Sequence, residues 1–130
     1  MTRRILVVDD DRSVREAIQQ VLEKAGYQVV LSADGREAEA YYFPGQVDLV
    51  LLDLNLPLQS GWEVFERLTR RYPLVPVIVI TGMPDQYETA RAVGAGALIE
   101  KPLDVSDLLN AMEKLLAEPQ DTPLKRMCGF

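Results

Sequence analysis

The sequence predicts an α/β fold: a doubly wound, five-stranded parallel sheet with helices on both faces. Short aliphatic runs alternate along the chain with longer stretches in which apolar residues recur at helical spacing. One run, residues 49–52, is aliphatic without interruption, which is typical of a strand covered on both faces. The connections are short, and five successive β-then-α units with short connections imply a parallel sheet between two layers of helices.

The expected strands follow one another at regular intervals. They lie at residues 5–8, 27–31, 47–53, 76–81 and 97–99. A helix is expected after each strand, at about residues 14–25, 34–42, 60–72, 84–93 and from 104 onward.

Capping and stop signals set several helix ends. Gly26 and Gly94 each follow the last apolar residue of a helix. Ser60 and Glu63 form a capping box that begins the third helix. Asp104 caps the last helix, whose inward-facing residues are expected to be Val105, Leu108, Met112, Leu115 and Leu116.

Length and composition exclude several classes of protein. The 130 residues fit a single domain, expected at 1–118, followed by a polar tail or start of a linker at 119–130. The net charge of −6 argues against a nucleic-acid surface. The chain has no histidine and a single cysteine, Cys128, which excludes His-dependent catalysis, His-ligated metals and an intrachain disulfide. No segment is long enough to span a membrane, so a cytoplasmic protein is expected.

Polar side chains stand where the expected strands end. In a parallel sheet all these ends lie along one edge, which is where ligands bind in open α/β sheets. If strand 1 lies beside strand 3, their helices go to opposite faces and open a crevice there. The residues at this edge are Asp9, Asp10, Ser32, Asp53, Thr81 and Lys101.

Clustered carboxylates of this kind predict a hard divalent cation. Two carboxylates about 4 Å apart repel by about 4 kcal/mol at an effective dielectric near 20, so both stay ionised only beside a cation. Oxygen ligands without His or Cys suit Mg²⁺, which favours phosphoryl oxygens. An Asp beside it can attack phosphorus to form an acyl phosphate, while Thr81 and Lys101 contact the phosphoryl oxygens.

Each of these residues taken singly also has a structural explanation. Asp10 or Asp11 could cap the first helix, Thr81 suits a strand end, and Lys101 could be a solvated charge. Compatible groups at four of five strand ends are hard to explain by chance, so the set favours a site.

Several short motifs occur in a fixed order and together are highly specific. They are Ile5-Leu6-Val7-Val8-Asp9-Asp10, Leu52-Asp53-Leu54-Asn55-Leu56-Pro57 with Gly61, Ile80-Thr81-Gly82, Gly94-Ala95 and Lys101-Pro102. Through them, residues 3–117 resemble the receiver domain of bacterial two-component response regulators. The resemblance implies a flavodoxin-like sheet of order 2-1-3-4-5.

The resemblance also implies a role for each site residue. Asp53 would be the phosphoacceptor, and Thr81 and Lys101 would be the family's hydroxyl and lysine. Mg²⁺ would be held by Asp10 directly, by Asp9 largely through water, by Asp53, and by the backbone carbonyl of Asn55. The Lys101–Pro102 peptide bond would be cis.

The partners follow from the same resemblance. A histidine kinase or phosphotransfer protein would donate the phosphoryl group, and a downstream effector or an output domain absent from this chain would respond. The chain would catalyse only its own phosphorylation and dephosphorylation. The face built from helix 4, strand 5 and helix 5 would change, and a homodimer through it is left open.

Two alternatives compete with this interpretation. Leu98 stands where the family usually has a switch Tyr or Phe, which favours a phosphorylation-independent interaction domain. An enzyme of the haloacid-dehalogenase type also uses a strand-end Asp, Mg²⁺ and a Lys. It needs a second Asp two residues on, where this chain has Asn55, and usually a cap domain.

Overall fold

Five parallel strands form one sheet in the order β2-β1-β3-β4-β5, which confirms the predicted fold class. The computed structural model describes residues 2–42, 45–56 and 60–117; the expected tail at 119–130 lies outside them. Strands and helices alternate: β1 Arg4–Val8, α1 Arg12–Lys24, β2 Gln28–Ser32, α2 Gly35–Tyr41, β3 Leu49–Asp53, α3 Gly61–Arg71, β4 Val77–Thr81, α4 Tyr87–Val93, β5 Ala97–Glu100 and α5 Val105–Ala117.

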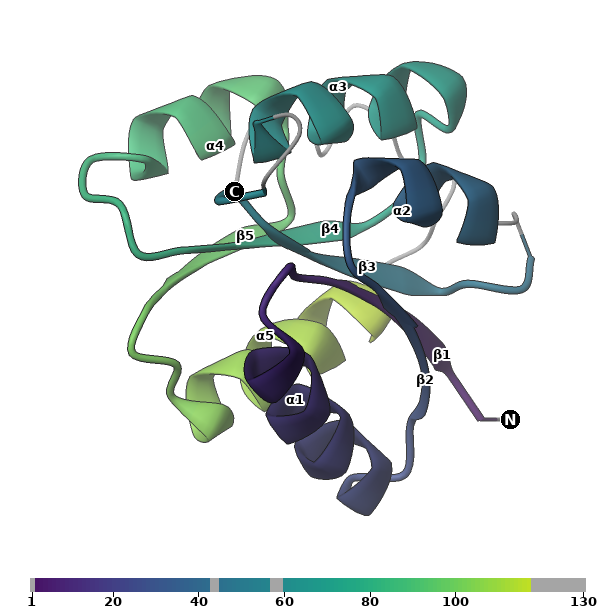
Figure 1. Ribbon diagram of the computed structural model, residues 1–130. Helices are drawn as coiled ribbons and strands as arrows, with labels where there is room; N and C mark the ends of the chain where they lie inside the picture. The colour runs from purple at the N-terminus through teal and green to yellow at the C-terminus, as the bar shows by residue number, and fades with distance from the viewer. Residues whose placement is uncertain (1, 43–44, 57–59, 118–130) are drawn as a thin grey trace.

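The helices cover the sheet on both faces, with α1 and α5 on one side and α2, α3 and α4 on the other (Figure 1). Alternate residues of each strand enter opposite cores. In β1, Ile5 and Val7 pack with residues of α1 and α5, whereas Leu6 and Val8 pack with residues of α2 and α3. All five residues of β3 and of β4 are buried, as expected for strands covered on both sides.

The register brings the carboxyl ends of the strands to one edge of the sheet. Val8 pairs with Leu52, Asp53 with Ile80, and Thr81 with Glu100. These neighbouring strands therefore end within one residue of each other, and the residues at and just beyond the ends of β1, β3, β4 and β5 gather at a single edge.

Two helices differ from the expectation. α4 begins at Tyr87 rather than at 84, because Asp85 adopts a φ of 60°, in the left-handed region that a right-handed helix excludes. Val105 was expected to face inward but is 43% exposed. It is the first residue of α5 and lines the rim of an apolar hollow between α1 and α5 rather than packing beneath the helix.

The predicted caps are present. Ser60 accepts a hydrogen bond from the Glu63 backbone N–H at 3.2 Å, and Asp104 accepts one from the Asp107 N–H at 3.0 Å. Between Asp10 and Asp11, the structure assigns the cap of α1 to Asp11, whose carboxylate accepts from the Ser13 N–H at 2.9 Å. No helix in the described residues is long and apolar enough to cross a bilayer.

Candidate functional site

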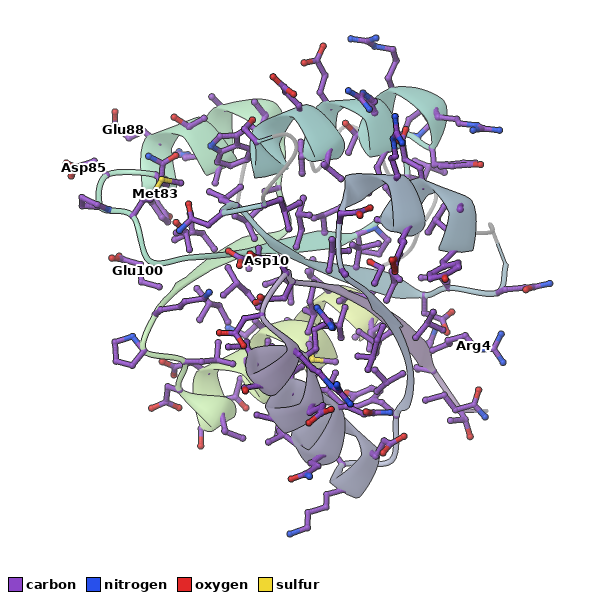
Figure 2. The ribbon with its side chains drawn as sticks, in the orientation of Figure 1. Arg4, Asp10, Met83, Asp85, Glu88 and Glu100 are labelled. Atoms are coloured by element: carbon purple, nitrogen blue, oxygen red, sulfur yellow. The ribbon has the colours of Figure 1, made fainter. Side chains whose placement is uncertain are left out.

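Three carboxylates converge at the carboxyl edge of the sheet. Asp53 is the last residue of β3, and Asp9 and Asp10 directly follow β1. One carboxylate oxygen from each lies within 4.8 Å of the others. Asp9 and Asp53 are each 2% exposed, whereas Asp10 is exposed. In Figure 2, Asp10 lies at this edge, just beyond the end of β1.

Backbone groups orient the two buried carboxylates. One oxygen of Asp53 accepts a hydrogen bond from the Asn55 N–H at 3.0 Å, and one oxygen of Asp9 accepts from the Asp11 N–H at 2.9 Å. Each carboxylate therefore keeps its other oxygen, Oδ2, for a further partner. The Asn55 contact also brings the fourth predicted metal-binding residue next to Asp53.

The ammonium of Lys101 lies between these carboxylates. Its Nζ is 3.3 Å from Asp53 Oδ2 and 3.8 Å from Asp9 Oδ2. The backbone N–H of Lys101 donates to the Thr81 carbonyl at 2.8 Å, which holds the loop after β5 against the end of β4. The Lys101–Pro102 bond is cis, as the resemblance implies.

Thr81 completes the edge. It is fully buried at the end of β4, and its Oγ1 accepts a hydrogen bond from the Met83 N–H at 2.9 Å. A hydroxyl that accepts in this way still has its own proton to donate. Ser32, at the end of β2, is also buried, but its Oγ lies 3.5 Å from the Val7 carbonyl of the neighbouring strand.

The acidic cluster is electrostatically strained without a cation. The pKa of Asp9 is raised from 3.8 to about 6, chiefly by burial and also by the nearby Asp53 carboxylate, against the lowering effects of the Asp11 N–H and of Lys101. Three carboxylates thus share this edge with one ammonium. A hard divalent cation fits the donor set, because all three side chains offer oxygen and Asp10 is open to solvent.

The site depends on a close approach between α3 and β3. Gly61, the first residue of α3, donates its N–H to the Leu54 carbonyl at 2.9 Å. A Cβ at this position would lie 2.4 Å from Leu54 Cα and 2.7 Å from the Asp53 carbonyl oxygen. Only glycine allows the helix to start against the residue that follows Asp53.

A model of the response regulator receiver domain matches residues 5–113 of the chain. The chain belongs to the response regulator receiver domain family. It is 39% identical over 108 residues to the transcriptional regulatory protein DltR of Streptococcus agalactiae, covering 82% of this chain and 48% of that protein. It is also 39% identical over 118 residues to the response regulator MprA of Mycolicibacterium vanbaalenii, covering 89% and 51%. The chain thus spans about half the length of these curated relatives.

Solved receiver domains have the same fold. The CheY-like receiver domain of Methanospirillum hungatei superposes with a TM-score of 0.82 at 31% identity, covering 96% of this chain and 98% of that one. Response regulator TrrA of Thermotoga maritima, solved in complex with Mg²⁺ and BeF, gives a TM-score of 0.81 at 30% identity, covering 88% and 99%.

The structure also reveals contacts that the sequence patterns did not indicate. Arg15 donates to the Asp9 backbone carbonyl at 2.7 Å, so α1 supports the first acidic residue. Trp62 in α3 donates its indole N–H to Gln86, the N-cap residue of α4, at 2.9 Å. Neither contact has a sequence signature: the first depends on how α1 leaves the end of β1, and the second joins residues 24 positions apart in the chain.

Leu98, at the switch position of this receiver domain, lies in β5 and is half-buried. It packs, together with Met83 and Trp62, against the core beneath α2, α3 and α4.

Proposed function

We propose that this receiver domain is a signalling switch that accepts a phosphoryl group on Asp53 from a histidine kinase or a phosphotransfer protein. The observation that supports it best is the position of Asp53, whose Oδ2 faces the Lys101 ammonium at 3.3 Å while Oδ1 is held by the Asn55 N–H. Its membership of the receiver family and the Mg²⁺ and BeF bound to TrrA support the same chemistry.

The transfer is a displacement at phosphorus. The free oxygen of Asp53 forms a bond to phosphorus as the bond from phosphorus to the donor's histidine nitrogen breaks, and the electron pair stays with the nitrogen. A Mg²⁺ held by Asp9, Asp10, Asp53 and the Asn55 carbonyl would neutralise charge on the carboxylates and on the phosphoryl oxygens. Asp10, being exposed, suits direct coordination, and the buried Asp9 suits contact through water.

Two side chains of the chain would then stabilise the phosphoryl group. Lys101 would exchange its contact with Asp53 Oδ2 for one with a phosphoryl oxygen, and Thr81 would donate its free hydroxyl proton to another. Since Thr81 ends β4 and Lys101 directly follows β5, we infer that phosphorylation shifts the β4–α4 loop and the face built from α4, β5 and α5.

The component that responds to phosphorylation is a downstream effector protein or an output domain. DltR and MprA are named as regulators, and this chain spans about half of each. We propose that residues 1–118 form the receiver domain and that 119–130 form a tail or lead toward such an output.

A phosphorylation-independent interaction domain is the second candidate, and Leu98 is the observation that favours it. Without a ring at this position, a Thr-to-aromatic relay cannot report the state of Asp53. The two proposals differ in whether an acyl phosphate forms.

Incubation with Mg²⁺ and a small acyl phosphate tests the proposal directly. The intact protein should gain the mass of one phosphoryl group, and Asp53→Asn should gain none. Asp48→Asn, which changes an acid at the opposite edge of the sheet, serves as the matched control and should still be labelled. Labelling of Asp53→Asn would refute Asp53 as the acceptor, and no labelling of the parent protein would favour the second candidate.

A further inference from the structure

The face between α4 and α5 contains a hollow of about 390 Å³ along β5. Its apolar surface comes from β5 and from Ala111 of α5, and Tyr87 of α4, 54% exposed, stands at its side. Three exposed carboxylates line the rest, from Glu100, Asp104 and Asp107. No lysine or arginine is among the described residues that line it. In Figure 2, Glu100 is seen beside β5, on the same side of the view as Asp85 and Glu88.

The hollow is connected to the phosphoacceptor site through adjacent residues. Lys101 contacts Asp53 and Asp9, while its two chain neighbours, Glu100 and Pro102, line the hollow. Glu100 also pairs in register with Thr81. A displacement of Lys101 at the site would therefore move the wall of the hollow.

We propose that this hollow docks a protein segment that presents an arginine or lysine beside an aliphatic side chain. The aliphatic group would cover the apolar surface near Leu98 and Tyr87, and the cation would lie among Glu100, Asp104 and Asp107. This inference deepens the proposed function, because it names the chemistry of the partner that the α4–β5–α5 face receives.

A second copy of this chain fits the hollow poorly. In a two-fold symmetric dimer with this hollow on the axis, the three carboxylates of one copy would lie close to those of the other. Like charges brought together at an interface oppose association, whereas the negative potential of the three carboxylates attracts a cationic partner. Charge complementarity therefore selects a different, basic partner.

The probe is a synthetic amphipathic helical peptide of Ala, Leu and Arg, with a twin that has Glu in place of Arg. Titration into the isotope-labelled protein is followed by amide NMR, with and without Mg²⁺ and beryllium fluoride as a phosphoryl mimic. The Arg peptide should shift the amides of Leu98, Glu100 and Ala111 in at least one state, and the Glu twin should shift none of them. Binding should weaken as salt is raised.

A matched pair of variants separates the hollow from the general negative charge. Glu100→Gln, Asp104→Asn and Asp107→Asn together should weaken binding roughly tenfold, in line with the loss of several rim charges. Asn is a good helix cap, so α5 should remain intact. Glu16→Gln, Glu23→Gln and Glu66→Gln remove the same charge from α1 and α3 and should leave binding unchanged.

Three results would overturn the inference: no shifts in either state, equal weakening by both sets of variants, or self-association of the chain through Glu100. The mass assay on Asp53 reports on the proposed function separately. Peptide docking without acyl phosphate formation would support this inference and refute the proposed signalling role. Acyl phosphate formation without peptide docking would support the signalling role and refute this inference.

Discussion

Lys101 links the two buried carboxylates of the acidic cluster to the surface. Its ammonium contacts two buried carboxylates, its backbone N–H is held by the end of β4, and its side chain is 31% exposed. A residue so placed can neutralise charge and also transmit a change at Asp53 to β5. Neutralising charge requires only a cation, whereas transmitting the change requires the length and point charge of lysine.

Lys101→Arg should separate these two roles. The guanidinium keeps the positive charge, so Mg²⁺ binding should persist, but its planar fork cannot occupy the position of the ammonium between two Oδ2 atoms. We therefore expect phosphorylation to proceed without the usual change in amide hydrogen exchange across α4, β5 and α5. Lys114→Arg, on the surface of α5, is the control, and an unaltered exchange response in Lys101→Arg would count against this role.

Gly61 is a position where adding a single Cβ atom should destabilise the fold. Gly61→Ala places a Cβ within 2.4 Å of Leu54 Cα, so α3 or the end of β3 must move. We expect a loss of about 1–3 kcal/mol in the free energy of unfolding, the range typical of overpacking. Urea denaturation measures it, with Gly82→Ala as the control, because a Cβ there meets only Lys101 Cδ at 3.9 Å. Equal stability of the two variants would show that the contact relaxes freely.

At the scale of elements, α3 and α4 are joined by a hydrogen bond beside the site. Trp62 donates to Gln86, and its indole packs edge-on to Phe65 with ring centroids 5.8 Å apart. Gln86 follows Asp85 in the turn before α4, and Met83 in the same loop is held by Thr81. The β4–α4 loop is thus fixed at one end by Thr81 and at the other by α3.

This arrangement makes Trp62 a reporter of the loop. It is the chain's single tryptophan, so the tryptophan fluorescence of the protein comes from this residue alone. If Thr81 moves toward a phosphoryl group, the loop should shift and the environment of the indole should change. Acyl phosphate with Mg²⁺ should therefore alter the emission of the parent protein but not that of Asp53→Asn. Gln86→Leu should reduce the response, and a full response in that variant would show that the hydrogen bond does not report the loop.

For the molecule as a whole, the acidic cluster links stability to pH and to metal. The folded-state pKa of Asp9 is raised by burial from 3.8 to about 6, so the folded protein holds this proton more tightly than the unfolded chain. In the metal-free protein, the stability from Asp9 is complete below pH 3.8 and is lost as the pH rises through about 6. A divalent cation binds only the deprotonated carboxylates, so its effect has the opposite sign.

Mg²⁺ should therefore raise the melting temperature more above this pKa than below it. Thermal denaturation with and without Mg²⁺, at about pH 7.5 and about pH 5, measures the difference. Asp9→Asn should make the Mg²⁺-induced rise in melting temperature smaller and nearly independent of pH. An increment in the parent protein that is the same at both pH values would mean that the titrating carboxylate does not contribute to the metal site.

The fold and the family could be predicted almost entirely from the sequence, for a local reason. Uninterrupted aliphatic runs such as residues 49–52 specify strands buried on both faces, and caps such as Ser60 and Asp104 specify helix starts. The errors were local too. The pattern that predicts a helix from Pro84 does not reveal the left-handed Asp85, and the spacing that puts Val105 on the apolar stripe of α5 does not reveal its exposure.

The sequence by itself determined which polar residues end each strand, and so which groups are available at the edge: Asp9, Asp10, Asp53, Thr81 and Lys101. Only the tertiary structure decided how they meet, because their distances depend on strand order and register rather than on spacing along the chain. The 3.3 Å contact of Lys101 with Asp53 and the hydrogen bond between Trp62 and Gln86 join distant parts of the chain through packing. A local pattern fixes conformation, whereas contacts between distant segments appear only when the whole core is closed.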